Sequence, residues 1–244
     1  MMADSPPQRH DTAAARYRAV VFDLFGTLVN ASTAADRLTI ARQIGSALGV
    51  ATLTVDVVLR RTWRERHDGS LPTVLTLAER LVSLCGGTAD QTTTVVRLLR
   101  AAARHRLVTD LSVLHAVKLL RSNGVRIGLL SDATADIADG WDRCPLSRLF
   151  DAAVFSCTAR NVKPHPRLYH EVLDRLAVAA NEALYCGDGG GDELRGARRA
   201  GMHVVGVEPR GATALPAIIR WRGPVVHRVE DVVSLVLPAK RIVR

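Results

Sequence analysis

The chain has 244 residues, of which 48% are hydrophobic and 23% are charged, and its formal net charge is +9. This composition excludes a mainly disordered protein and allows one core domain with a smaller inserted domain. No apolar run approaches the roughly 20 residues of a membrane helix, and the first fifteen residues lack the apolar block of a signal peptide. We therefore expect a soluble, cytoplasmic protein without a membrane partner, in which residues 1–15 form a disordered tail.

The basic charge raises the question of a nucleic-acid partner, because basic proteins displace counterions from phosphates. Basic residues are spread over the whole chain, however, and aromatic residues make up 4%, which is too few for base-stacking platforms. An anionic small-molecule substrate fits the charge as well, and we expect that partner, bound by a monomer or a homodimer. The four cysteines are far apart and show no paired metal-ligand spacing, which favours reduced thiols.

The first predicted element is the apolar run VVFDLFGTLV at residues 20–29, which indicates a buried strand that ends on the carboxylate of Asp23, before a glycine turn. Apolar residues then recur with helical spacing over residues 38–105. Breaks at Gly49, at residues 68–72 and at residues 86–87 divide this stretch into four helices. An all-helical segment therefore interrupts the chain at residues 31–108.

Strand-like and helical segments alternate after residue 109, which indicates a parallel sheet covered on both faces. The expected strands cover residues 125–131, 152–156, 182–188 and 203–208. The expected helices cover residues 111–124, the surroundings of Trp141, and residues 166–177 and 193–201. A closing segment covers residues 225–236. We therefore expect an α/β fold: a Rossmann-like doubly wound parallel sheet built from residues 16–30 and 109–244, with the helical domain inserted.

Polar side chains follow several of the expected strands, at the edge where open α/β sheets bind ligands. An aspartate there, Asp23, can attack a phosphorus or carbon centre and form a covalent ester, although it could also cap the turn. Thr27, Ser131 and the amides of the turn at Gly26 can donate hydrogen bonds to oxygens of the transferred group. Ser131 could instead cap the following helix.

Lysine is rare in this chain, which has three lysines among its 33 basic residues. Lys163, in the segment NVKPHP, suits an ammonium that touches a carboxylate and a phosphate together, although an ordinary surface lysine is the alternative. Asp188 and Asp192 flank three glycines and offer the hard oxygen ligands that suit Mg²⁺. With Asp23 and the main-chain carbonyl of Phe25 they could complete an octahedral site, whereas Asp192 could instead be a helix N-cap.

The segments FDLFGTLV, GLLSDAT, KPHPRLY and YCGDGGGDELRGARRAGM, in this order, resemble the four motifs of the haloacid dehalogenase superfamily of hydrolases. The resemblance covers nearly the whole chain after the first fifteen residues. It implies that the helical insert is a cap domain over the active site and that Asp23 is the nucleophile. We also assign Gly26, Asp132 and Arg64 to substrate binding.

One position departs from the phosphatases of this superfamily. They usually carry, two residues after the nucleophile, a second aspartate that acts as general acid and base, and here that residue is Phe25. Haloacid dehalogenases have an aromatic residue there, but they work without metal and usually replace the glycine-aspartate pair of the fourth motif, which this chain keeps at Gly187 and Asp188. Acidic groups beside a carboxylate nucleophile are costly unless a cation neutralises them.

We therefore expect a Mg²⁺-dependent phosphatase that acts on a small phosphorylated metabolite through an aspartyl-phosphate intermediate. A 2-haloacid dehalogenase that acts through an aspartyl ester is the alternative, and a catalytically inactive binding protein of the same fold is the second alternative.

Several residues of the insert could shape specificity. Some could face the cleft and hold an anionic or planar part of the substrate, although a solvated helix face is the favoured interpretation. These residues are Arg60, Arg61, Trp63, Arg64, Arg66 and His67. His67 and His165 are also candidates to replace the missing acid, and Tyr169 resembles a family position beside the lysine or is a core residue. We expect hinges near residues 30–33 and 107–110.

Overall fold

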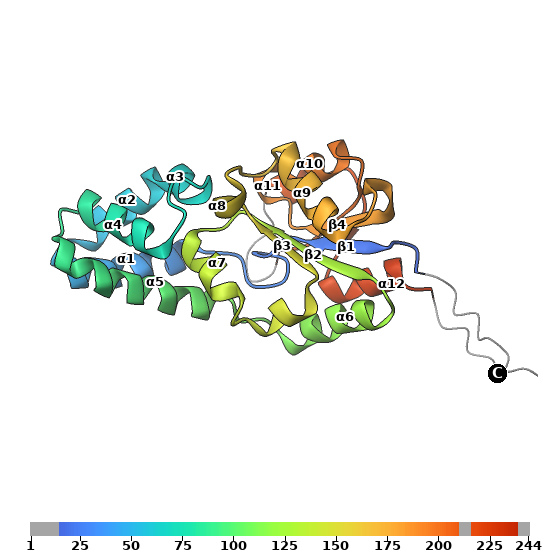
Figure 1. The fold of residues 1–244 in the computed structure, drawn as a ribbon, viewed down its shortest axis with the longest axis horizontal. Coiled ribbons are helices and arrows are strands. Elements are labelled where there is room, and N and C mark those ends of the chain that lie inside the picture. Colours follow the sequence, from blue (N-terminus) through green and yellow to red (C-terminus); the bar gives the residue numbers. More distant parts are fainter. Residues whose placement is uncertain (1–14, 210–215, 239–244) are drawn as a thin grey trace, which may run out of the picture.

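The computed structural model of the chain describes residues 15–209 and 216–238 (Figure 1). The tail expected at residues 1–15 falls, except for its last residue, outside these ranges. Six strands form one parallel sheet in the order β3-β2-β1-β4-β5-β6. Their bounds are β1 (Ala19–Phe22), β2 (Arg126–Ser131), β3 (Ala152–Phe155), β4 (Ala183–Gly187), β5 (His203–Val207) and β6 (Val225–Val226). The expected α/β fold with a doubly wound parallel sheet is confirmed.

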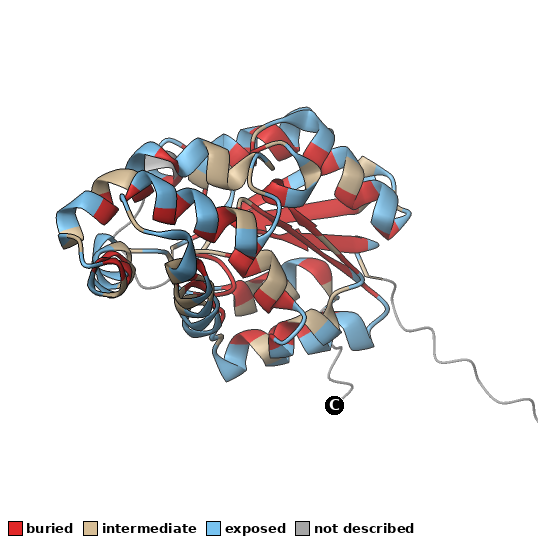
Figure 2. Cartoon of the chain, turned by 60° about the vertical axis from the view of Figure 1, so that its left-hand side comes forward, coloured by how far each residue is buried: buried red, intermediate tan, exposed pale blue. Residues whose placement is uncertain are grey.

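The strands of this sheet are almost continuously apolar because both of their faces are covered. Along β1, Val20 and Phe22 join one buried cluster, and Ala19 and Val21 join another on the opposite face. Figure 2 shows the same strands coloured as buried throughout the centre of the molecule. Successive side chains of a strand point to opposite faces of the sheet, so they pack under opposite layers of helices.

Helices cover the two faces in separate layers. One face packs against α6 (Leu111–Ser122), α7 (Ala135–Trp141) and α12 (Val232–Val236), and the other packs against α9 (Pro166–Leu176) and α10 (Glu193–Arg199). In Figure 1 the sheet lies between α6 and α12 below and α9 and α10 above. Shorter helices complete this part: α8 (Ser156–Ala159), α11 (Pro216–Ile219), η2 (Pro145–Leu149), η3 (Ala180–Glu182), η4 (Gly190–Asp192) and η5 (Val229–Asp231).

Residues 34–106 form a group of helices beside the sheet, at the left of Figure 1, which we call the helical block. It has a buried cluster of its own, around Ile44, Leu77, Leu81 and Val95. Its apolar residues therefore pack chiefly against one another. Its elements are α1 (Ala34–Leu48), α2 (Thr52–Arg61), α3 (Trp63–His67), α4 (Val74–Leu84), η1 (Ala89–Gln91) and α5 (Thr92–Arg106).

The expected second helix of this block is broken into two, α2 and α3. Between them, Thr62 has φ −92° and ψ 9°, and its hydroxyl donates to the carbonyl of Val58 at 2.8 Å. The carbonyl of Leu59 accepts from the guanidinium of Arg66 at 2.8 Å. Side chains thus satisfy backbone acceptors at the break, and α3 can leave the direction of α2.

The first apolar run is a strand only as far as Phe22. Beyond Asp23 the chain turns back on itself, because the amides of Leu28 and Val29 both donate to the carbonyl of Leu24, at 2.9 and 3.0 Å. Leu24, Leu28 and Val29 are nevertheless buried. Residues 24–29 are therefore apolar because they are buried in a turn and not because they form a strand. This turn leaves the carboxylate of Asp23 beyond the end of β1.

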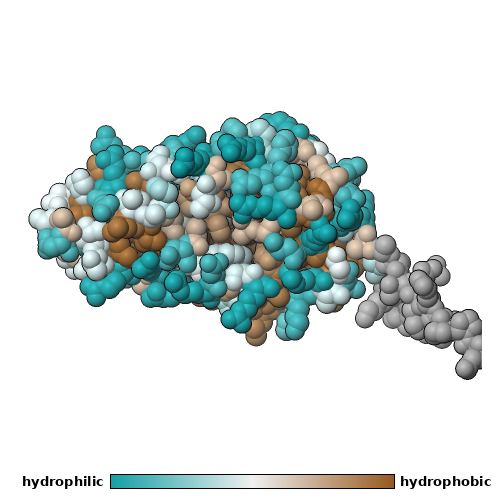
Figure 3. Space-filling model, viewed as in Figure 1, coloured by the Kyte–Doolittle hydropathy of each residue, from teal (hydrophilic) through white to brown (hydrophobic). Residues whose placement is uncertain are grey.

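The face that Figure 3 presents is mostly hydrophilic, with one apolar patch on the helical block and further apolar patches over the part that holds the sheet. Large apolar residues exposed on this block include Leu53, Trp63 and Leu75. Among the described helices, none is by itself both long and apolar enough to cross a membrane. Helices α1 and α2 reach that length and composition only as a pair, and the chain bends by 120° between them.

Candidate active site

The order of the strands creates a switch point at the carboxyl edge of the sheet, the place where open α/β sheets bind ligands, and we call this place the crevice. Chain order runs outward in opposite directions from β1 and from β4, which lie side by side, so the connections that follow them go to different faces. Asp23 follows β1 and Asp188 follows β4. The two carboxylates expected at strand ends are therefore brought to the same crevice, where both are buried.

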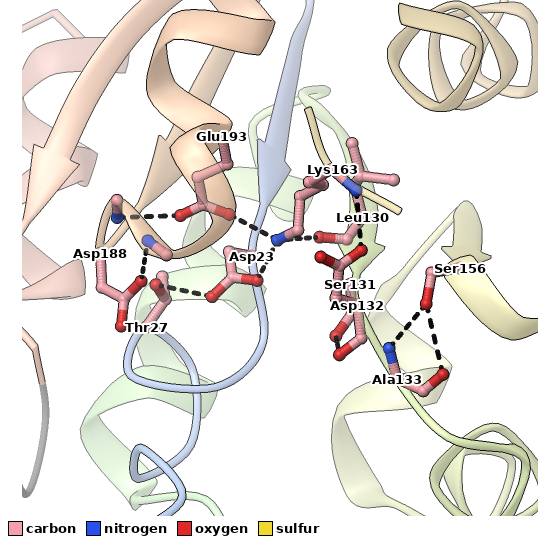
Figure 4. Close-up of polar contacts among 12 residues, drawn as sticks. Asp23, Thr27, Leu130, Ser131, Asp132, Ala133, Ser156, Lys163, Asp188 and Glu193 are labelled. Atoms are coloured by element: carbon pink, nitrogen blue, oxygen red, sulfur yellow. Dashed lines mark hydrogen bonds and ion pairs between the residues drawn. The ribbon is translucent and has the colours of Figure 1, made fainter. Parts of the chain in front are cut away.

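Lys163 reaches this crevice from the loop before α9 (Figure 4). Its Nζ lies 2.6 Å from Oδ1 of Asp23, contacts Oε2 of Glu193, and donates to the carbonyl of Leu130 at 3.3 Å. Burial by itself would lower the pKa of Lys163, but the charges of Asp23 and Glu193 hold it well above its ordinary value. The ammonium is thus a permanent positive charge against the carboxylate of Asp23.

Glu193, the first residue of α10, belongs to the site although the motif analysis passed over it. Its Oε1 accepts from the amide of Gly189 at 3.0 Å, and its Oε2 accepts from the hydroxyl of Tyr185 at 2.7 Å and from Lys163. The side chain is completely buried. A signal was present in the sequence: Glu193 precedes Gly196 and Ala197 by three and four residues, so it lies on the buried face of α10.

Asp192, which we expected to be a metal ligand, lies outside this group. Its backbone has φ +56°, its side chain is about half exposed, and the nearest basic group is the guanidinium of Arg195 at 3.6 Å. The left-handed backbone turns Asp192 toward solvent and its neighbour Glu193 inward. The second acidic residue of this motif at the crevice is therefore Glu193.

Three buried carboxylates form what we call the acidic cluster: Asp23, Asp188 and Glu193. Each offers an oxygen, and these oxygens lie within 4.8 Å of one another. Burial, followed by the negative charge of Asp23, raises the pKa of Asp188 to about 6 and that of Glu193 to about 8. Three carboxylates share one ammonium here, so burial and the excess of negative charge act together on the pKa values.

The turn after β1 supports the nucleophile candidate. The hydroxyl of Thr27, fully buried, donates to Oδ2 of Asp23 at 3.3 Å. Gly26 has φ +86°, and a Cβ at this position would lie 2.0 Å from Oδ2 of Asp188. Only a glycine therefore lets the turn and Asp188 approach so closely.

The loop after β2 holds the lysine. Asp132 accepts from the main-chain amide of Lys163 at 3.0 Å through Oδ1. Ser131 is buried at the end of β2, and its hydroxyl has a 3.5 Å contact with the carbonyl of Asp132. In the structure Asp132 thus fixes the lysine loop, while Ser131 lies in the same loop without a hydrogen bond to Asp23.

The remaining candidates divide between the crevice and the surface. Tyr169 is buried and donates to the carbonyl of Glu193 at 3.1 Å, which places it beside the site. His165 is the N-cap of α9 and accepts from the amide of Arg167 at 3.3 Å. Arg64 is 70% exposed and pairs with Asp68 at 3.4 Å. Burial raises the pKa of Asp132, and the charge of Arg64 offsets only a part of this shift.

The other candidates on α2 and α3 also have partners. Arg60 pairs with Asp56 at 3.0 Å. His67 stacks on Trp63, with ring centroids 4.4 Å apart, and its Nδ1 is 2.7 Å from the carbonyl of Trp63. Arg61 is exposed.

The chain is similar in sequence to known hydrolases. The family described as haloacid dehalogenase-like hydrolase matches residues 17–201. The (S)-2-haloacid dehalogenase 4A of Burkholderia cepacia is 25% identical over 80% of this chain and 84% of its own length. The glyceraldehyde 3-phosphate phosphatase of Methanopyrus kandleri is 30% identical over 43% of this chain and 48% of its own length.

A solved structure of a haloacid dehalogenase-family enzyme from Bacteroides thetaiotaomicron, in complex with magnesium and inorganic phosphate, superposes with a TM-score of 0.64 at 15% identity. The alignment covers 80% of this chain and 96% of that chain, and it shows a shared fold. This chain spans less than half the length of the first curated relatives that it matches.

Proposed function

The chain belongs to the haloacid dehalogenase-like hydrolases, and we propose that within this family it is a Mg²⁺-dependent phosphatase of small phosphorylated metabolites, with Asp23 as the nucleophile. The observation that carries this proposal is the acidic cluster. Its three carboxylates lie within 4.8 Å of one another, and the ammonium of Lys163 is the only cation within ion-pairing distance among the described residues. A divalent cation would offset the remaining negative charge.

The donors at the crevice fit Mg²⁺, which prefers hard oxygen ligands. Three donors occupy both oxygens of Glu193. Oδ2 of Asp23 accepts only one long bond, from Thr27 at 3.3 Å, and Oδ2 of Asp188 accepts none from the described residues. We therefore assign the ion to the side chains of Asp23 and Asp188 with the carbonyl of Phe25, and we assign Glu193 to orienting Lys163. When bound, Mg²⁺ would supply positive charge that offsets the nucleophile and the phosphoryl oxygens.

Each residue of the site then has its own role in the proposed reaction. A carboxylate oxygen of Asp23 forms a bond to phosphorus while the bond to the leaving oxygen breaks, and water later releases phosphate from the aspartyl phosphate. Lys163 and Thr27 hold Asp23 in place, and the ammonium attracts the phosphoryl oxygens. Phe25 has no proton to give, so substrates whose leaving group is stable as an anion are favoured.

Release of inorganic phosphate from a panel of phosphorylated metabolites tests the proposal. We expect turnover with Mg²⁺, loss of turnover with EDTA, and a loss of about 10³-fold or more in Asp23→Asn, because the nucleophile is removed. Asp192→Asn is the matched control, since this exposed aspartate lies outside the acidic cluster and should keep its activity. Turnover that survives EDTA or Asp23→Asn would contradict the proposal.

A second candidate function is 2-haloacid dehalogenation, which Phe25 favours because a halide leaves without a proton. The relative from Burkholderia cepacia, aligned over most of both chains, supports the same alternative. Chloride release from 2-chloropropionate in the presence of EDTA would reverse the order of the two candidates. Failure of that reaction alongside Mg²⁺-dependent phosphate release would establish the phosphatase.

A further inference from the structure

Arg106, the last residue of α5, reaches from the helical block to the turn that carries the nucleophile. Its guanidinium carbon lies 4.3 Å from the centroid of the Phe25 ring, two residues after Asp23. It also contacts the hydroxyl of Ser32. The aromatic ring thus holds a planar cation at the position where related phosphatases carry their second aspartate.

A second arginine of the helical block, Arg66 on α3, lies near the first. Its Nε donates to the hydroxyl of Thr62 at 3.2 Å and its Nη2 donates to the carbonyl of Leu59 at 2.8 Å, so both partners are neutral. Burial lowers the pKa of Arg66 to about 10, and the charge of Arg106 acts in the same direction. Both side chains are partly buried, and Arg106 is close enough for its charge to act on Arg66.

Neither arginine makes an ion pair within 4.0 Å with a carboxylate of the described residues. Three carboxylates act on them, all from beyond ion-pairing distance: Asp136 on both arginines, Asp36 on Arg106 and Glu65 on Arg66. Five arginines of the helical block make ion pairs, namely Arg37, Arg60, Arg64, Arg80 and Arg100. The other arginines of the block without an ion pair are exposed, whereas Arg66 and Arg106 are partly buried. A partly buried cation without such a partner is costly unless an anion binds to it.

We propose that Arg106 and Arg66 form a subsite for a second anionic group of the substrate, a carboxylate or a phosphate, beside the group that Asp23 attacks. The planar forks of two guanidinium groups match either anion through paired hydrogen bonds. This inference deepens the proposed function and rests on it for the identity of the first group. A substrate that fills both sites would be a phosphorylated acid or a bisphosphate.

Isothermal titration calorimetry with phosphonates that cannot be hydrolysed tests the subsite. The probes are methylphosphonate, phosphonoacetate, which adds a carboxylate, and methylenediphosphonate, which adds a second phosphonate, each with Mg²⁺. We expect phosphonoacetate, methylenediphosphonate or both to bind about tenfold or more tightly than methylphosphonate. The stronger of them distinguishes a carboxylate from a phosphate as the second group.

Arg106→Gln should remove most of this affinity ratio while leaving methylphosphonate affinity nearly unchanged. Arg104→Gln is the matched control, because Arg104 is exposed on the same turn of α5. If Arg106→Gln does not fold, Arg66→Gln provides the same comparison. Equal affinity of the unmodified protein for all three probes, or an unchanged ratio in the folded variant, would overturn the subsite.

The experiments can refute the phosphatase and the subsite independently of each other. Absence of phosphate release together with a high affinity ratio would remove the phosphatase and leave the subsite. Phosphate release that depends on Asp23, together with equal affinities, would leave the phosphatase and remove the subsite.

Discussion

Gly26 sets how closely two parts of the crevice approach each other. The turn after β1 needs φ +86° at this residue, and the carboxylate of Asp188 packs directly against its Cα. A side chain here would meet Oδ2 of Asp188 at 2.0 Å, well inside any allowed contact. The position of Asp188 relative to the nucleophile therefore depends on the absence of a Cβ at residue 26.

Gly26→Ala should displace Asp188 and lower Mg²⁺-dependent phosphate release by about tenfold or more, since one carboxylate of the proposed metal site moves. Gly49→Ala is the control, because Gly49 also has a left-handed backbone, at φ +72°, but has nothing within 4 Å of an added Cβ. Both variants should lose about 1–2 kcal/mol from backbone strain, measured by urea unfolding. Equal activity in the two variants would show that Asp188 is not held by Gly26.

Site residues that directly follow a strand could be predicted from the sequence. Asp23 and Asp188 end apolar runs, and parallel strands deliver such residues to one edge. Asp192 and Glu193 show the limit, because both are acidic and adjacent. Their assignment depends on the left-handed backbone at Asp192. Aspartate adopts this conformation more readily than most residues but still uncommonly, so the sequence alone does not predict it here.

Among the elements, α3 is the short helix of the block that packs against α8 of the sheet domain. It exists because Thr62 and Arg66 satisfy carbonyls at the break after α2. Periodicity predicted one continuous helix here, since the apolar spacing runs through the break and side-chain bonds to the backbone leave no periodic signal. By contrast, α5 covers residues 92–106 as its spacing predicted, because no side chain competes with its backbone hydrogen bonds.

His67, the last residue of α3, should make the protein sensitive to mild acid. Burial lowers its pKa from 6.5 to about 4, while its hydrogen bond to Trp63 acts in the opposite direction; Arg66 and Arg106 lower the pKa further and Asp68 raises it. The folded state therefore binds fewer protons than the unfolded state between these values. Its contribution to stability is present above about pH 6.5 and is lost as the pH falls toward 4.

His67→Asn should lose this part of the acid sensitivity, because asparagine can keep a donor near the Trp63 carbonyl without titrating. The loss in the unmodified protein is at most about 3 kcal/mol between pH 7 and pH 4. Urea unfolding of both proteins at pH 7, 6 and 5 measures the difference. Parallel pH dependence in the two proteins would mean that His67 does not carry the effect.

At the scale of the whole molecule, the sheet and the helical block have separate buried clusters, and the crevice lies at the end of the sheet nearest the block. The sequence predicted this division from the change in period, from alternating strands and helices to helices alone. It could not predict that Arg106 packs on the ring of Phe25, two residues after Asp23. This contact depends on how α5 packs on the sheet domain, and packing between distant segments has no local sequence signal.

The acidic cluster should also control the stability of the whole protein. Burial and the charge of Asp23 raise the pKa of Asp188 to about 6, so its ionised form destabilises the folded state at pH 7. The folded state binds more protons than the unfolded state between pH 3.8 and about 6, and stability from this group rises as the pH falls through that range. A bound divalent cation should have the same stabilising effect at neutral pH.

Asp188→Asn should therefore raise the melting temperature in EDTA, since it removes one buried negative charge, and should abolish the response to Mg²⁺. In the unmodified protein, Mg²⁺ at 100 times its dissociation constant should stabilise the fold by about 2.7 kcal/mol, or about 5–10 °C in melting temperature. Asp192→Asn should respond to Mg²⁺ like the unmodified protein. Differential scanning calorimetry measures all three, and an identical Mg²⁺ response in Asp188→Asn would place the ion elsewhere, because a ligand stabilises the folded state only through groups that it contacts there.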